Sequence, residues 1–258
     1  MGVVAAAPAR ARSYANLSVA KPHRKLRRTF EPWQLPYKRD DSPDCLTADQ
    51  MGLVEKIYQS QVSPRTDQVI FPGLAKGTEA SMANSDNGKP FPVALSMLYF
   101  AFQNPNWDWT TLNWDTDVNA AIAKIGPLMH VGADLKPSCA GGGKLLMYIG
   151  WNDGHNPEQQ IEYFKSEMRY AGNTTRASAR WFTIPSIEHR WGGEGCDTFN
   201  KRGVIDARVN QDWAPDRITA SKVSDAQTVR TRCARPQVAE YKGTGDIDDG
   251  TNFICTRE

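Results

Sequence analysis

Two residues with acid–base side chains stand at matching places in the sequence. Asp153 follows an apolar run at residues 144–149, and His189 follows a second apolar run at residues 180–184. If both runs are parallel strands, their carboxyl ends meet at the sheet edge where α/β proteins bind ligands and carry out chemistry. A histidine there can take a proton from a hydroxyl nucleophile, while a carboxylate fixes its tautomer and stabilises the imidazolium. The order Asp then His is that of the last two members of an α/β-hydrolase triad. Taken singly, each residue is also common as an ordinary loop side chain.

The segment between the two residues has the signals of a helix. Asn156-Pro157 fits a helix start, with Asn as the N-cap and Pro at the first helical position. Ile161, Phe164 and Met168 form an apolar stripe, and Gly172 fits the helix end. The sequence therefore predicts a βαβ unit that brings Asp153 and His189 to one sheet edge.

A second helix is predicted earlier in the chain. Thr47-Ala-Asp-Gln50 fits a capping box, and apolar residues follow at helical spacing at Met51, Val54, Ile57 and Tyr58. We expect this helix to end before Ser63-Pro64, and Phe71-Pro-Gly-Leu74 to form a turn.

Residues 104–117 are rich in aromatic and acidic side chains. Trp107, Trp109 and Trp114 could form a platform for stacking sugars, but such residues more often anchor a loop by burying large surfaces, and we favour the anchor. Asn113, Asp115 and Asp117 alternate as calcium ligands do, but the glycine that a calcium loop requires is missing. The sequence thus predicts no metal site here.

Composition narrows the class of protein. The chain has 258 residues, 40% hydrophobic and 23% charged, which is ordinary for a globular domain and excludes a wholly disordered chain. The longest mostly apolar run, residues 91–102, is far shorter than the roughly 20 residues that a membrane helix needs. Residues 1–40 hold nine basic and two acidic side chains, whereas the remainder is mildly acidic, which argues against nucleic acid as the main partner.

A series of motifs in fixed order resembles the C-terminal half of the tannase and feruloyl esterase family, from about Cys45 to Cys255. The motifs are Cys45-Leu-Thr-Ala-Asp-Gln50, Phe71-Pro-Gly-Leu74, Asn104-Pro-Asn-Trp-Asp-Trp109, Gly142-Gly-Lys-Leu-Leu146, Gly150-Trp-Asn-Asp153, His189 with Gly192-Gly193, Ala214-Pro-Asp-Arg-Ile218 and Pro236-Gln-Val-Ala-Glu-Tyr-Lys-Gly-Thr-Gly-Asp246.

The resemblance implies a fold, an activity and residue roles. It implies an α/β fold, the C-terminal portion of an α/β-hydrolase core with part of an inserted lid. It implies a serine carboxylic ester hydrolase that cleaves esters of phenolic acids through an acyl-enzyme. Asp153 and His189 match the catalytic Asp and His, and Cys233 and Cys255 match a disulfide pair. The partner is then a small phenolic ester, without nucleic acid or membrane, and the location extracellular, although no clear signal peptide is present.

The chain departs from the family in its nucleophile and in one cysteine. The sequence contains no Gly-x-Ser-x-Gly turn and no Cys-Ser motif, and the family's upstream calcium loop is also missing, so no cofactor is expected in this chain. Arg190 stands where the family has a cysteine after the catalytic His. Cys196 could substitute for that cysteine, and the pairing of Cys45 and Cys139 stays open. We therefore expect the chain alone to be a poor esterase. The alternative is a diverged, non-catalytic remnant that binds phenolic or glycoside ligands.

Three regions are expected along the chain. Residues 1–44 form a basic, disordered head, residues 45–135 a partial lid, and residues 136–258 the C-terminal part of the α/β-hydrolase core.

Overall fold

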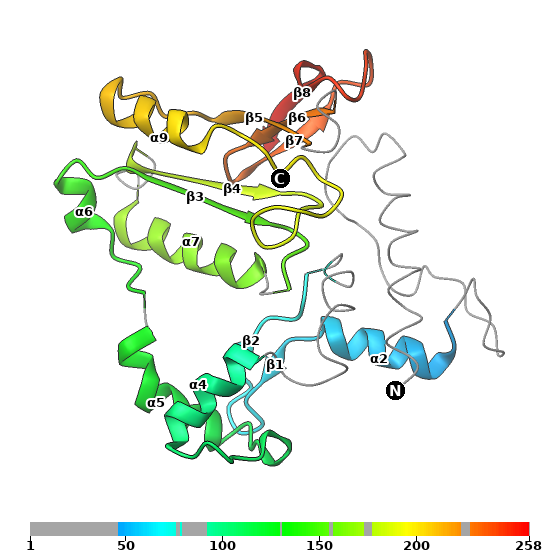
Figure 1. Ribbon diagram of the computed structural model, residues 1–258, viewed down its shortest axis with the longest axis vertical. Helices are drawn as coiled ribbons and strands as arrows, with labels where there is room; N and C mark the ends of the chain where they lie inside the picture. The colour runs from blue at the N-terminus through cyan, green and yellow to red at the C-terminus, as the bar shows by residue number, and fades with distance from the viewer. Residues whose placement is uncertain are drawn as a thin grey trace.

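The computed structural model describes residues 46–75, 78, 92–129, 131–154, 157–172, 177–222 and 228–257, and the expected head at 1–44 lies outside them together with Cys45. Figure 1 shows the elements in chain order. The helices are α2 (Ala48–Tyr58), α4 (Pro92–Phe102), α5 (Asp117–Met129), α6 (Lys136–Ala140), α7 (Pro157–Ala171) and α9 (Lys201–Asn210), with short 3₁₀ helices η2 (Trp109–Thr111) and η3 (Gly250–Asn252). The strands are β1 (Gln61–Val62), β2 (Val69–Phe71), β3 (Leu145–Gly150), β4 (Ala179–Ile184), β5 (Arg217–Ser221), β6 (Val229–Cys233), β7 (Gln237–Tyr241) and β8 (Phe253–Arg257).

The predicted βαβ unit forms from β3, α7 and β4. The two strands pair in parallel, with Leu145 opposite Ala179 and Gly150 opposite Ile184. Each strand lies within one residue of its predicted bounds, and α7 begins at Pro157 and is followed by Gly172, as the helix signals indicate. The proposed N-cap, Asn156, lies outside the described residues.

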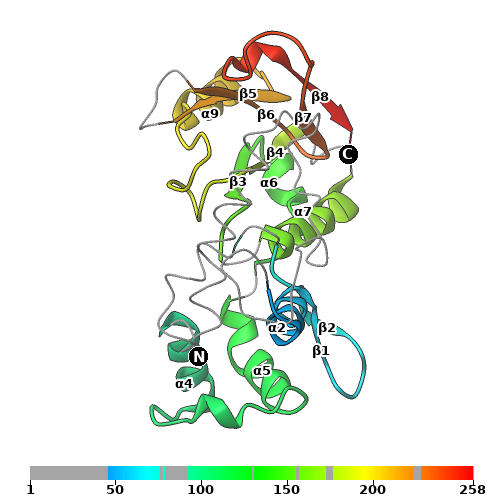
Figure 2. The same ribbon diagram turned by 90° about the vertical axis from the view of Figure 1, so that its right-hand side faces the viewer.

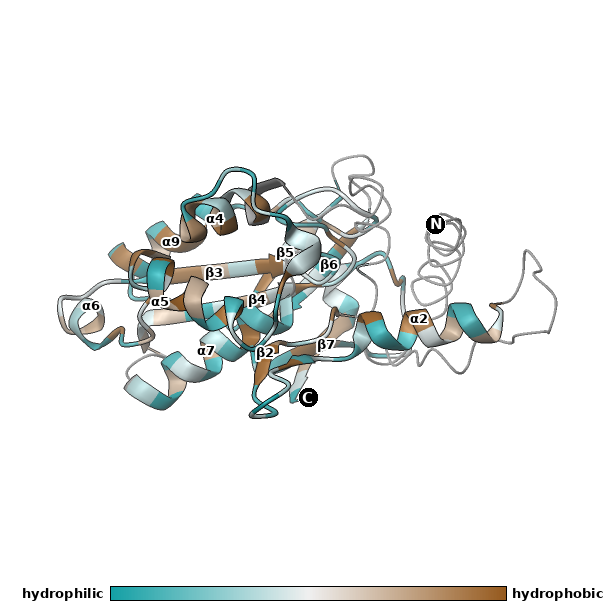
Figure 3. Cartoon of the chain, turned by 90° about the horizontal axis from the view of Figure 1, so that it is seen from below, coloured by the Kyte–Doolittle hydropathy of each residue, from teal (hydrophilic) through white to brown (hydrophobic). Residues whose placement is uncertain are grey.

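Helices cover both faces of this parallel pair. α7 lies on one face and α9 on the other, as the two perpendicular views show (Figures 1 and 2). On the α9 face, Leu146 and Tyr148 pack with Phe182 and Val204. On the α7 face, the rings of Phe164 and Trp181 lie 5.8 Å apart. Burial on both faces explains why β3 and β4 are nearly continuous apolar runs, which Figure 3 shows as largely hydrophobic colouring along β3.

Two antiparallel hairpins complete the C-terminal part. β5 pairs with β6, and β7 pairs with β8. The backbone N–H of Arg235, between β6 and β7, donates to Trp181 O at 2.8 Å, which ties this region to β4. A disulfide joins Cys233 to Cys255, the pair that the family resemblance implied.

The first described elements gather at the other end of the molecule. α2 begins with the predicted capping box, in which Thr47 and Gln50 satisfy each other's backbone groups. The helix ends at Tyr58, before Ser63-Pro64 as predicted. The chain then forms β1, which begins at Gln61 and pairs with β2. Figures 1 and 2 show α2, β1, β2, α4 and α5 together, away from β5–β8. No described helix is long and apolar enough to cross a membrane.

Candidate active site

Asp153 and His189 meet at the end of the parallel strands. β3 ends at Gly150 and β4 at Ile184, so each residue lies in the segment that follows its strand. Nδ1 of His189 lies 2.7 Å from Oδ2 of Asp153, within hydrogen-bond distance, although the residues are 36 positions apart in sequence. The structure therefore brings together the two residues that the sequence singled out.

The two side chains have opposite exposure. The Asp153 side chain is 1% exposed, whereas that of His189 is 60% exposed. A buried carboxylate on Nδ1 holds the imidazole in one orientation, and the exposed part of the ring stays accessible to a reacting group. This is the arrangement that a general base needs, with one end fixed and the other available.

Backbone contacts set the distance between the two segments. The N–H of Trp151 donates to Ile184 O at 2.9 Å, and that of Asn152 donates to Ile187 O at 3.0 Å. Gly150 allows this approach, because a Cβ there would collide with the carbonyl oxygens of Ile187 and Glu188. The glycine at the end of β3 thus permits the Asp153–His189 contact.

A buried aspartate holds the loop that carries His189. Oδ2 of Asp197 accepts from Gly192 N–H at 3.0 Å, and Lys222 Nζ lies 3.6 Å from the same atom. Lys222 also donates to Gly193 O at 2.5 Å, where a φ of 71° favours glycine. Sequence reasoning missed Asp197 and Lys222, because no local spacing links them to His189. The Gly192-Gly193 pair was the available signal that this loop needs unusual backbone angles.

Two cysteines, Cys139 in α6 and Cys196 after the His189 loop, form no disulfide in the part of the chain that the structure describes. Burial raises the pKa of the Cys196 thiol, although the nearby Arg232 and Arg230 act in the opposite direction. Arg190, which follows His189, is exposed.

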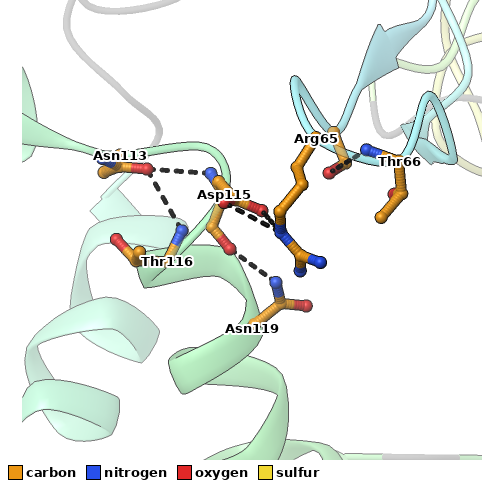
Figure 4. A network of polar contacts seen from close by, with 7 residues as sticks. Arg65, Thr66, Asn113, Asp115, Thr116 and Asn119 are labelled. Atoms are coloured by element: carbon orange, nitrogen blue, oxygen red, sulfur yellow. Dashed lines mark hydrogen bonds and ion pairs between the residues drawn. The ribbon is translucent and has the colours of Figure 1, made fainter.

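The acidic segment before α5 is occupied by protein contacts. Figure 4 shows the Arg65 guanidinium on both carboxylate oxygens of Asp115, at 3.0 and 3.1 Å from Nε. The Asn113 side chain accepts from the backbone N–H groups of Asp115 and Thr116. Across the described residues, no group of three or more His, Cys, Asp or Glu is placed to hold a metal ion.

Of the three tryptophans in residues 104–117, not all bury their side chains as loop anchors. Trp107 packs against Phe102, with ring centroids 4.8 Å apart. Trp109 and Trp114 remain 39% and 42% exposed, so the expectation that they anchor a loop by burial is wrong for these two. They lie in and beside the short helix η2, none of whose residues is buried.

Comparison with known proteins decides the family. Residues 29–256 match the family model described as tannase and feruloyl esterase. The chain belongs to the tannase and feruloyl esterase family. An uncharacterized esterase of Xanthomonas campestris pv. campestris is 30% identical over 88% of the chain and 49% of its own length. A probable feruloyl esterase B of Emericella nidulans is 26% identical over 83% of the chain and 45% of its own length.

The fold agrees with solved members of the tannase and feruloyl esterase family. The crystal structure of feruloyl esterase B from Aspergillus oryzae superposes with a TM-score of 0.78 at 23% identity, over 88% of this chain and 50% of that one. This superposition confirms the expected α/β fold class. The division into partial lid and partial core stays a prediction. The chain spans about half the length of the curated relatives it matches.

Proposed function

We propose that this chain supplies the acid–base pair of a serine carboxylic ester hydrolase that acts on esters of phenolic acids. The observation that supports this most is the 2.7 Å contact between buried Asp153 and exposed His189 at the ends of adjacent parallel strands. Membership of a family whose relatives are feruloyl and related esterases supports the substrate class. We also propose that the protein acts outside the cell, as the family resemblance implies.

The proposed mechanism gives each side chain one task. A serine hydroxyl attacks the ester carbonyl carbon while His189 takes its proton, and the Asp153 carboxylate stabilises the imidazolium that forms. The carbon–oxygen bond to the alcohol then breaks, and His189 gives the proton to the departing oxygen, which leaves an acyl-enzyme. Water repeats the cycle, releasing the phenolic acid and restoring the serine.

We propose that the serine comes from a segment outside this sequence, which has no Gly-x-Ser-x-Gly turn. A strand from that segment could pair with the edge of β3 away from β4, since β3 pairs with β4 alone in the described part of the chain. The register and the Trp151–Ile184 hydrogen bond place the backbone groups of Leu146 and Tyr148 on the side away from β4. A further parallel strand paired there would end near His189.

Reconstitution tests the proposal. The chain would be co-expressed with the part of the Xanthomonas campestris esterase that lies outside the matched region, and hydrolysis of methyl ferulate followed. Activity in the co-purified pair, lost in His189→Ala and absent from the chain alone, is the expected result. A pair that co-purifies but stays inactive would refute the acid–base role. Strong hydrolysis by the chain alone would refute the external serine.

One observation favours a second candidate, a non-catalytic protein that binds phenolic or glycoside ligands. Arg190 stands beside His189 where the family resemblance leads us to expect a cysteine, and no nucleophile turn is present in the sequence. A serine-reactive fluorophosphonate distinguishes the two functions. Labelling of the reconstituted pair supports the hydrolase, whereas ferulate binding without labelling supports the binding protein.

A further inference from the structure

The loop after β4 carries an aromatic side chain beside His189 that the proposed mechanism does not use. Trp191 lies two positions after His189, and two residues span at most about 7 Å of backbone. Trp191 is 70% exposed, which makes it the most exposed tryptophan among the residues that the structure describes. Tryptophan is largely buried on average, because burying its ring system removes a large apolar area from water. An indole left in solvent at this position is therefore available to a ligand.

The loop that presents Trp191 is held closed at its base. Gly195 N–H donates to Ser186 O at 2.8 Å, and the chain on either side is buried, with Ile187 at 0% and Cys196 at 2% exposure. Ser186 has a φ of 61°, an uncommon backbone angle for this residue type, at the point where the chain leaves β4. Residues 189–191 are exposed between these fixed ends. A ring on such a loop loses less conformational entropy on binding a ligand than a ring on a free loop.

The indole of Trp191 stacks on no other ring within the described part of the chain. None of the aromatic and cation–π contacts formed there includes it, whereas Trp107 packs on Phe102. Aromatic rings stabilise one another beyond the area that they bury when they meet offset or edge to face. The group that best complements this exposed surface is thus a second aromatic ring.

We propose that Trp191 binds the aromatic ring of the acyl group and so determines a preference for aromatic over aliphatic esters. This inference rests on the proposed hydrolase, in which the ester carbonyl lies beside His189. A ring attached to that carbonyl is within reach of an indole two residues away, whereas a short alkyl chain has no ring to stack on it. Trp191 takes no part in proton transfer, so its effect falls on the choice of acyl group.

Hydrolysis of two esters of the same alcohol tests the proposal. The reconstituted pair would be assayed with methyl ferulate and methyl butyrate, and the ratio of the two kcat/KM values compared between variants. This ratio does not depend on how much active pair forms. Trp191→Ala should lower the ratio about tenfold, since about 1.4 kcal/mol is within the range for removal of a stacking aromatic side chain. Trp191→Phe keeps a ring and should lower the ratio only a few-fold.

Trp213→Ala is the matched control. Trp213 is also well exposed, at 50%, but it lies at the other end of the parallel strands. It follows Asp212, whose carboxylate is 3.1 Å from Nζ of Lys144, the residue immediately before β3. Trp213→Ala is expected to keep the parent's ratio.

Three results would overturn the proposal. The first is an unchanged ratio in Trp191→Ala. The second is an equal fall of the ratio in Trp191→Ala and Trp213→Ala. The third is failure of Trp191→Ala, but not of Trp213→Ala, to co-purify with the added esterase segment, which would show that the indole contacts that segment instead of the substrate.

A binding measurement separates this inference from the proposed function. If the parent pair hydrolyses neither ester, the proposed function fails, and titration of the 258-residue chain with ferulate decides the inference. The same titration decides it if Trp191→Ala does not fold, as thermal unfolding would show. A saturable shift of the Trp191 indole N–H resonance, assigned by its loss in Trp191→Phe, would support the ring-binding role. An unchanged resonance would overturn it.

Discussion

Gly150→Ala is the substitution most specific to the candidate site. The added methyl carbon would lie much closer than 3.0 Å to the carbonyl oxygens of Glu188 and Ile187, whereas real Cβ atoms keep at least that distance from other atoms. Both are backbone atoms of the segment that carries His189, so no flexible side chain can move aside. Because interiors are close-packed, we expect the two segments to separate by about 1 Å.

The cost of that separation can be worked from the structure. A shift of this size breaks the hydrogen bond from Asn152 N–H to Ile187 O, which is 3.0 Å long. Losing a partner for a buried backbone group costs about 1–3 kcal/mol. Overpacking adds about 1–3 kcal/mol. Gly150→Ala should therefore lower the free energy of unfolding by about 2–6 kcal/mol, which at about 2–4 °C per kcal/mol lowers Tm by about 4–24 °C.

Two measurements check this prediction. Thermal unfolding followed by circular dichroism gives Tm, and the low-field proton resonance of His189 Nδ1–H reports the contact with Asp153. Gly52→Ala in α2 is the matched control, since nothing lies within 4 Å of a Cβ there. Alanine in a helix should stabilise it by about 0.5–1 kcal/mol relative to glycine. A Gly150→Ala protein with the parent's Tm and an unchanged resonance would refute the reasoning.

Three further substitutions test other parts of the structure. Burial raises the pKa of Glu167, so its contribution to stability is intact below the ordinary carboxyl pKa and is lost as the pH rises through the raised value. Glu167→Gln should therefore raise Tm at pH 8 and not at pH 4, and an equal effect at both would contradict this. Replacing Cys233 and Cys255, 22 residues apart, by serine should cost about 3 kcal/mol in denaturant titrations, and an unchanged midpoint would count against a stabilising role. Asp197→Asn should speed hydrogen exchange at Gly192 N–H about tenfold, because a charge-assisted acceptor is lost, and unaltered exchange would show that Asp197 does not hold the loop.

Local signals account for what the sequence could predict. The apolar runs of β3 and β4 can each be recognised from a few consecutive residues. Pro157 and Gly172 likewise mark the start and end of the helix between them. The right-handed connection of a βαβ unit then places the two strand ends together, so the Asp153–His189 contact followed from topology.

The rest depends on contacts between distant residues. Asp197 reaches back to Gly192, and Lys222 reaches Gly193 from another segment, so no spacing rule identifies either residue. Burial of an aromatic side chain is also decided by tertiary packing. Trp109 and Trp114 are large aromatic residues of the kind that anchor loops, yet both stay partly exposed.

The geometry of the candidate site is fixed by the βαβ unit together with two residues that follow it in the chain. The contacts that fix it run from the end of β3 to the loop after β4, through Gly150, Asn152 and Ile187, and from that loop to Asp197 and Lys222. All of these residues belong to the described part of this chain. The acid–base pair should therefore be formed before any nucleophile is supplied. The proposed hydrolase can then fail at two separable steps, formation of the pair and delivery of the serine. The His189 resonance reports the first step and fluorophosphonate labelling the second.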